Sequence, residues 1–221
     1  MLSVANAARR NRDTVNIAED THSFAEIRAA RKQAIHNFAQ TTLHGVKEIV
    51  WEIGCGHGHF LTAYAATHPD RICVGIDLAG DRITRAVKKR DHAKLPNLAF
   101  VQAEARLFIE SLPETIALSE IFVLFPDPWP KLRHHKHRIV QPGFLTLVAR
   151  RAVPTCRLCF RTDFRPYFDE VTDTLRNHTE WRLTGEPWPF EFETVFQRRA
   201  LHFHSLTARV HKQDGPEARR V

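Results

Sequence analysis

Hydrophobic residues recur along the chain in two alternating patterns, which predict helices and strands in turn. Between residues 23 and 38, apolar residues fall at helical spacing and predict a leading helix. From residue 48 onward, short apolar runs alternate with helical patterns. The apolar runs predict strands at 48–51, 72–76, 98–101, 121–125, 158–160, 181–183 and 201–210. The helical patterns predict helices at 59–66, 81–89, 107–112, 144–151 and 167–175.

Most of the predicted strands carry apolar residues on both faces, which indicates a parallel sheet covered by helices on both sides. The last strand differs, because Leu201 and Phe203 alternate with His202 and His204. No clear crossover helix separates it from 181–183, and such a connection pairs strands antiparallel. We therefore expect an α/β fold with a doubly wound, mostly parallel seven-stranded sheet of the Rossmann-like type, whose last strand is antiparallel.

The length of the chain suits one domain with a full core, because 221 residues leave no room for a second domain of similar size. Residues 1–22 are polar and aperiodic, so we expect a flexible arm there and a single domain over 23–221. No apolar stretch approaches the ~20 residues that a membrane helix needs. The first ten residues are too weakly apolar for a signal peptide. We expect a cytoplasmic protein with no membrane partner.

Two of the four cysteines, Cys156 and Cys159, form a CxxC pattern that can indicate metal or redox chemistry. They lie in an apolar run that predicts a buried strand, where residues three apart point to opposite faces. No second CxxC completes a zinc site. We therefore predict core cysteines, no disulfide framework and no bound metal.

Lys and Arg outnumber Asp and Glu by 32 to 25, which gives a net charge of +7. This balance suits a polyanionic partner such as nucleic acid. A basic enzyme with another kind of substrate fits the charge equally well.

A glycine-rich loop follows the first predicted strand, where ligands bind in open α/β sheets. Its glycines are Gly54, Gly56 and Gly58, and Glu52 precedes them by two positions. Dinucleotide sites use GxGxxG and place a pyrophosphate on the helix N-terminus. This loop reads GxGxG, and the Glu52 carboxylate would repel a pyrophosphate but suits the ammonium group of S-adenosylmethionine. We therefore predict S-adenosylmethionine as cofactor, bound by Glu52 and the three glycines.

Carboxylates also follow the next two strands. Asp77 ends the second strand, where a carboxylate can accept both ribose hydroxyls. Glu104 follows the third strand and is placed to meet the adenine edge. Either residue alone also fits a solvated strand end, but three acids at successive strand ends favour a cofactor site.

The segment after the fourth strand begins with Asp127 between two prolines, which stiffen its turn. We expect this carboxylate to face the transferred methyl group. Trp129 fits either stacking on a base or packing beneath the loop, and packing is the favoured interpretation. The residues at 131–138, here called the basic run, can neutralise several phosphates and make binding salt-dependent, although a solvated charged face is the alternative.

Over 50–210 the chain resembles the bacterial tRNA (guanine-N7)-methyltransferases, class I S-adenosylmethionine-dependent enzymes that modify a guanine in the tRNA variable loop. The most specific match is 125–129 with Lys131 and 133–141; supporting matches are 52–54 with Gly56 and Gly58, 75–77, 162–163 and 194–197. The resemblance implies that Glu52, Asp77, Glu104 and Asp127 contact the cofactor, with Asp127 as catalytic carboxylate. It implies that the substrate meets Lys131, Asp163, Thr194, Val195, Phe196 and Gln197. It implies that tRNA touches Arg133, His134, His135, Lys136, His137 and Arg138.

The chain departs from the family pattern mainly on the substrate side. The family usually has His at Pro130, Asp at Glu104, Gly at Ala200 and T-[KR]-F-E where 194–197 reads T-V-F-Q. A carboxylate accepts from both N1–H and N2–H₂ of guanine, whereas Gln197 offers one oxygen and a donor. Losing the charged acceptor would weaken base discrimination by about 1–3 kcal/mol.

The chemistry expected is direct displacement, in which a ring nitrogen lone pair attacks the sulfonium methyl. Guanine N7 carries no proton, so no general base is needed. Two other functions stay open: methylation of a small purine-like heterocycle, and a non-catalytic RNA-binding protein that holds the cofactor structurally. The sequence leaves both a monomer and a homodimer open.

Overall fold

A computed structural model describes residues 17–193, 197–198, 200 and 202–211, with side chains from residue 25 onward. The strands are β1 Glu48–Ile53, β2 Cys73–Asp77, β3 Leu98–Gln102, β4 Ala117–Leu124, β5 Ala152–Thr162, β6 Trp181–Thr184 and β7 His204–Val210. The helices are α1 Ile17–Thr42, α2 His59–Thr67, α3 Gly80–Ala93, α4 Ala105–Ser111, the 3₁₀ helix η1 Leu132–His137, α5 Pro142–Arg151 and α6 Arg165–Arg176.

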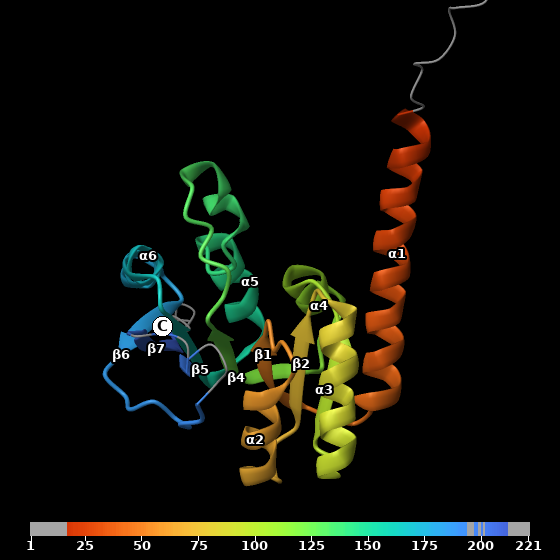
Figure 1. The fold of residues 1–221 in the computed structure, drawn as a ribbon, viewed down its shortest axis with the longest axis horizontal. Coiled ribbons are helices and arrows are strands. Elements are labelled where there is room, and N and C mark those ends of the chain that lie inside the picture. Colours follow the sequence, from red (N-terminus) through yellow and green to blue (C-terminus); the bar gives the residue numbers. More distant parts are fainter. Residues whose placement is uncertain (1–16, 194–196, 199, 201, 212–221) are drawn as a thin grey trace, which may run out of the picture.

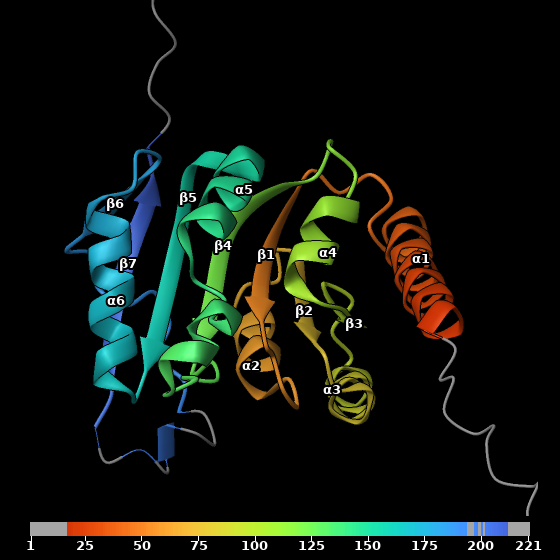
Figure 2. The same cartoon turned by 90° about the horizontal axis from the view of Figure 1, so that it is seen from above.

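The seven strands form one twisted sheet in the order β3-β2-β1-β4-β5-β7-β6. Strands β1 to β5 pair in parallel, whereas β7 lies antiparallel to both β5 and β6. Helices α1, α4, α5 and α6 cover one face of the sheet, and α2 and α3 cover the other (Figures 1 and 2). The predicted fold class, including the antiparallel last strand, is confirmed.

The element boundaries differ from the sequence prediction at several ends. Helix α1 begins at Ile17, six residues before the predicted start, and the rest of the predicted arm lies outside the described residues. Strand β5 begins at Ala152, so it is much longer than the predicted 158–160. The η1 helix was not predicted, because a run of cations and histidines has no apolar periodicity.

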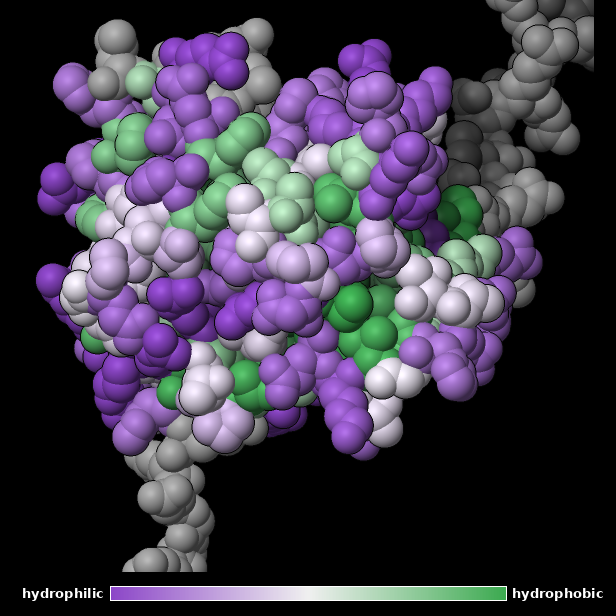
Figure 3. Space-filling model, turned by 90° about the horizontal axis from the view of Figure 1, so that it is seen from below, coloured by the Kyte–Doolittle hydropathy of each residue, from purple (hydrophilic) through white to green (hydrophobic). Residues whose placement is uncertain are grey.

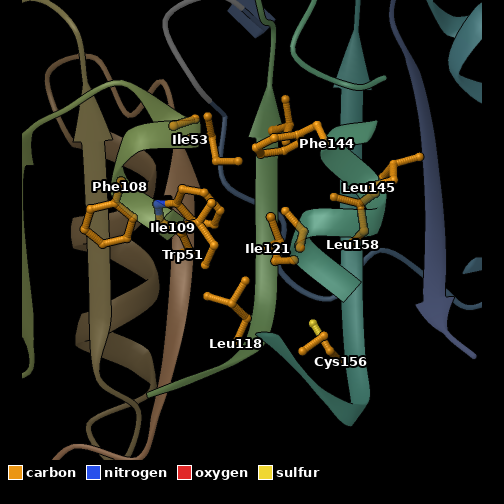
Figure 4. Close-up of a cluster of buried hydrophobic side chains, with 14 of the residues drawn as sticks. Trp51, Ile53, Phe108, Ile109, Leu118, Ile121, Phe144, Leu145, Cys156 and Leu158 are labelled. Atoms are coloured by element: carbon orange, nitrogen blue, oxygen red, sulfur yellow. The ribbon is translucent and has the colours of Figure 1, made fainter. Parts of the chain in front are cut away.

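The core lies on both faces of the sheet. On one face Trp51 of β1 stacks on Phe108 of α4 at a centroid distance of 5.3 Å (Figure 4). On the other face Phe60 of α2 packs edge-on against Phe122 of β4 at 4.8 Å. These rings fix α4 and α2 against the strands that carry the loops described below.

The two cysteines of the CxxC pattern lie on opposite faces of β5, as predicted. Cys156 belongs to the core beneath α5, and Cys159 to the core beneath α2. Both are buried thiols that form no disulfide. Within the described residues, no group of three His, Cys, Asp or Glu side chains is arranged to hold a metal ion. None of the helices in the described part of the chain combines the length and hydrophobicity needed to cross a bilayer.

Candidate active site at the carboxyl edge of the sheet

Four of the predicted acidic residues lie at the carboxyl edge of the sheet, where the parallel strands end. Because β1 lies between β2 and β4, the chain leaves β1 toward one side and returns on the other, and ligands bind at such a switch point in open α/β sheets. Glu52 lies in β1, Asp77 ends β2, and Glu104 and Asp127 follow β3 and β4.

The glycine loop between β1 and α2 has a backbone that few other residues can adopt. Gly54, Gly56 and Gly58 have φ values of 74°, 54° and 69°. At Gly58 a Cβ atom would lie 2.5 Å from the Phe100 ring and 2.9 Å from the Ala86 Cβ, so a larger side chain has no space. The close contact packs the start of α2 against β3 and α3.

Glu52 is a buried carboxylate with an unpaired oxygen. Its side chain is 4% exposed, and its Oε2 atom has no hydrogen-bond partner among the described residues. Burial raises the pKa of Glu52 from 4.5 to about 8, a backbone hydrogen bond from Leu61 opposes this rise, and Asp77 adds to it. Such a carboxylate is costly to ionise alone. It fits a site for a positively charged group such as the ammonium of S-adenosylmethionine.

Asp77 organises the glycine loop. Its Oδ2 accepts a hydrogen bond from the backbone N–H of Gly56 at 3.0 Å, and its Oδ1 accepts one from Ala79 at 2.9 Å. The Arg82 guanidinium lies 3.6 Å from Oδ2. Each carboxylate oxygen has a second lone pair, so the pair of oxygens can still accept from ribose hydroxyls.

Glu104 caps α4 through both carboxylate oxygens. Oε1 accepts from the backbone N–H of Arg106 at 2.8 Å, and Oε2 from Leu107 at 2.9 Å. The sequence analysis did not foresee this cap, because Ser, Thr, Asp and Asn are the usual residues there. The expected contact with an adenine edge stays a prediction, limited to the lone pairs that the cap leaves.

The loop that carries Asp127 is tightly constrained. Phe125 and Trp129 both adopt positive φ values, 48° and 42°, which side chains of this size rarely take. The Phe125 N–H donates to the carbonyl of Arg161 in β5 at 2.7 Å, which fixes the start of the loop. Asp127 is exposed between the two constrained residues. Its carboxylate therefore projects from a rigid turn at the carboxyl edge.

Arg138 holds the end of this loop. Its Nε donates to the Pro128 carbonyl at 2.9 Å, and a second guanidinium nitrogen donates to the Trp129 carbonyl at 3.4 Å. It forms an ion pair with Glu170 of α6 and lies 4.7 Å above the Tyr167 ring. Arg138 is only 3% exposed, so it is removed from the set of residues predicted to touch RNA.

The rest of the basic run faces solvent around η1. The exposed members are Lys131, Arg133, Lys136 and His137, whereas His134 and His135 are half-buried. The Trp129 ring lies 5.7 Å from His134 and 5.1 Å from His137, so it packs under the run as favoured above. Four side chains of the run thus stay accessible to a polyanion.

The substrate side is only partly within the described residues. Asp163 is exposed just after β5, and Gln197 is half-buried, but Thr194, Val195 and Phe196 lie outside the described residues. The sequence analysis missed Arg161, which is 3% exposed at the end of β5. The signal was a lone cation at the end of an apolar run, directly before the Thr-Asp pair.

Exposed hydrophobic residues also gather at the carboxyl edge. Leu78 after β2, Leu132 in η1 and Phe203 before β7 are 66%, 84% and 39% exposed. By contrast, hydrophilic residues cover most of the face formed by α2, α3 and the segment between β6 and β7 (Figure 3).

A cavity of about 520 Å³ opens at the opposite, amino-terminal edge of the sheet. Its buried carboxylate, Glu120, is already bound by Arg71, Arg157 and the Tyr64 hydroxyl. Since these partners satisfy the charge, we assign this network to folding and the carboxyl edge to function.

The sheet order with an antiparallel β7, together with a glycine loop flanked by acids, defines the class of protein: a methyltransferase of the class I fold, whose methyl donor is S-adenosylmethionine. Within this class, the chain belongs to the family described as "Putative methyltransferase", whose model matches residues 46–200.

Curated relatives share sequence over much of the chain. A tRNA (guanine-N(7)-)-methyltransferase of Brevibacillus brevis is 36% identical over 168 residues, covering 71% of this chain and 78% of the relative. One of Halorhodospira halophila is 34% identical, covering 69% and 68%. A Streptomyces coelicolor protein of the same name is 33% identical, covering 62% of this chain and 51% of the relative. The chain thus spans about half the length of the Streptomyces relative.

Solved structures share the fold. The 16S rRNA methyltransferase KamB has a TM-score of 0.56 at 20% identity, covering 75% of this chain and 88% of that one. The antibiotic-resistance methyltransferase Kmr has a TM-score of 0.51 at 22% identity, covering 80% and 93%.

Proposed function

We propose that the protein transfers a methyl group from S-adenosylmethionine to N7 of a guanine in tRNA, in the variable loop. The relatives' names support the substrate. The observation that carries the proposal is the buried Glu52 carboxylate, which has an unpaired oxygen and belongs to the residue two positions before the glycine loop, at the same edge as the Asp127 turn. A cationic donor and a nucleic acid are the two ligands that these features suit.

The donor supplies an activated methyl group on a sulfonium. Glu52 binds the ammonium end, Asp77 accepts from the ribose, and the glycine loop allows close approach of the backbone. N7 of guanine already carries a lone pair, so the chain need not remove a proton. As N7 is methylated the ring gains positive charge, and the Asp127 carboxylate stabilises that charge. Most of the acceleration comes from alignment of the two reactants.

The exposed members of the basic run, Lys131, Arg133, Lys136 and His137, bind the phosphates around the target base. A small purine-like heterocycle would not need this surface, so tRNA is the favoured substrate. A tRNA substrate places the proposed activity in the cytoplasm. The expectation for the active form is the one from sequence, a monomer or a homodimer.

The test uses the purified full chain, S-adenosylmethionine with a labelled methyl group, and tRNA from cells that lack 7-methylguanosine. The expected result is label in 7-methylguanosine after digestion to nucleosides. A matched reaction contains free guanosine, guanine and related heterocycles without tRNA. Label in a small heterocycle alone, or in no nucleoside at all, would refute the proposal.

A further inference from the structure

Arg161 is a buried cation that ties the segment between β6 and β7 to the end of β5. Its side chain is 4% exposed, and its Nε donates to the Ser205 hydroxyl at 2.8 Å. The guanidinium lies between two aromatic rings, 4.0 Å from the Trp188 centroid and 4.7 Å from the Phe203 centroid. A guanidinium so enclosed needs a negative partner, because its desolvation is otherwise uncompensated.

The negative partner is Glu191. Its two carboxylate oxygens accept from two guanidinium nitrogens of Arg161, at 3.0 and 3.2 Å, in a bidentate arrangement. The Gln197 side-chain oxygen accepts from the second of these nitrogens at 3.1 Å. Among the described residues, Glu191 is the only carboxylate in an ion pair with Arg161. Glu191 and Gln197 therefore share one nitrogen, but only Glu191 brings a charge.

This group borders the Asp127 turn. The Arg161 carbonyl accepts from the Phe125 N–H at the start of that turn, and the Phe125 ring meets the Phe203 ring edge-on at 6.2 Å. The side chain of Glu191 is 63% exposed, so its carboxylate is both oriented by Arg161 and open to a ligand. A fixed, accessible carboxylate thus lies on the substrate side of the site.

We propose that Glu191 is a specificity-determining residue that recognises the Watson–Crick edge of the target guanine, with Arg161 as the residue that positions it. The inference rests on the proposed function. Guanine presents two adjacent donors, N1–H and N2–H₂, and each carboxylate oxygen of Glu191 keeps a lone pair for one of them. Adenine presents an acceptor at N1, which the carboxylate repels. Glu191 thereby supplies the charged acceptor that position 197 lacks.

The first experiment compares Glu191→Gln with Glu193→Gln in the full chain. Glu193 lies two residues away and is paired only with the exposed Arg198 among the ion pairs of the described residues, so it is the matched control. The substrates are tRNAs with guanosine or inosine at the target position, since inosine lacks the N2 amine. We expect Glu191→Gln to lower kcat/KM for guanosine about 10- to 100-fold. We expect the preference for guanosine over inosine to shrink, and Glu193→Gln to retain both values.

The second experiment moves the carboxylate along the chain. In the double variant Glu191→Gln/Gln197→Glu, the charge returns to the same Arg161 nitrogen from the other side chain. We expect it to recover at least tenfold of the lost kcat/KM together with the guanosine preference. Binding of S-adenosylhomocysteine and the melting temperature show whether each variant folds.

Four results are distinguishable. A wild-type chain that methylates no tRNA defeats the proposed function itself. If the wild type is active, then full activity of Glu191→Gln overturns the inference. An equal loss for guanosine and inosine overturns it as well, because Glu191 would then only support the fold. So does a folded double variant that shows no recovery.

Discussion

Replacing Arg138 with Met separates the members of the basic run that we propose to bind RNA from the one that supports the Asp127 turn. The change keeps an unbranched side chain of similar length but removes the ion pair with Glu170 and both bonds to the carbonyls of Pro128 and Trp129. The matched change is Lys136→Met, at an exposed position two residues earlier.

The size of the effect follows from burial. Breaking a buried ion pair by removing one partner costs about 3–5 kcal/mol. The Arg138 side chain is 1% exposed, but that of Glu170 is 36% exposed and can regain water. We therefore expect Arg138→Met to lower the free energy of unfolding by about 2–3 kcal/mol. For a chain of this length, that lowers the melting temperature by about 4–12 °C. Lys136→Met should change the stability by less than about 0.5 kcal/mol.

In RNA binding we expect the larger effect from Lys136→Met and not from Arg138→Met. Losing one phosphate contact reduces the slope of log affinity against log salt concentration by about 0.7–0.9. We expect that reduction for Lys136→Met and no change of slope for Arg138→Met. The assays are urea denaturation and tRNA binding measured at several salt concentrations. An Arg138→Met variant with wild-type stability and a reduced salt slope would refute the assignment of Arg138 to the turn.

Three further predictions concern the cofactor side and the Asp127 carboxylate, which we propose to be catalytic. Gly58→Ala should destabilise the fold and weaken cofactor binding, because the φ of 69° and the contact with Phe100 leave no space for a methyl group; thermal melting with and without S-adenosylhomocysteine measures both. The pKa of Glu52 lies at about 8 in the folded state, above its ordinary 4.5, so the folded protein holds more protons between these values and its stability should fall as pH rises through that window. The ammonium group of the cofactor should lower the pKa of Glu52, so binding should release a proton and cofactor affinity should rise as the pH increases toward 8. Calorimetry in buffers of different ionisation enthalpy should show this proton release for the wild type and not for Glu52→Gln. Asp127→Asn should lower the rate of methyl transfer about 10- to 1000-fold in single-turnover assays at saturating S-adenosylmethionine, as expected for loss of charge stabilisation.

The apolar pattern predicted the strands of the sheet and the helices between them, because buried strands and amphipathic helices have different periods. The position of Glu52 was predicted approximately: the apolar run placed the end of the strand at Trp51, and β1 continues through Glu52 to Ile53. The absence of a crossover before β7 was visible as a missing helical pattern. Local periodicity therefore carries the topology and the cofactor edge.

What sequence reasoning missed depends on packing between distant segments. Arg133 and Arg138 belong to the same run of cations and histidines, yet Arg138 is buried against the Asp127 turn and Arg133 is exposed. The difference arises because η1 brings Arg138 against α6, more than thirty residues later. Arg161 likewise meets Glu191 across thirty residues of sequence. Such long-range partners leave no periodic signal, so charge alone could not assign either arginine.

The insertion of β7 between β5 and β6 has a consequence for how the enzyme is completed during synthesis. Until residues 204–210 leave the ribosome, the backbone of β5 has an open edge on that side, and an open edge invites pairing with other chains. The same stretch delivers Ser205 to the Arg161 guanidinium. A chain truncated before β7 would therefore be prone to aggregation, and its Arg161 guanidinium would lack the Ser205 partner.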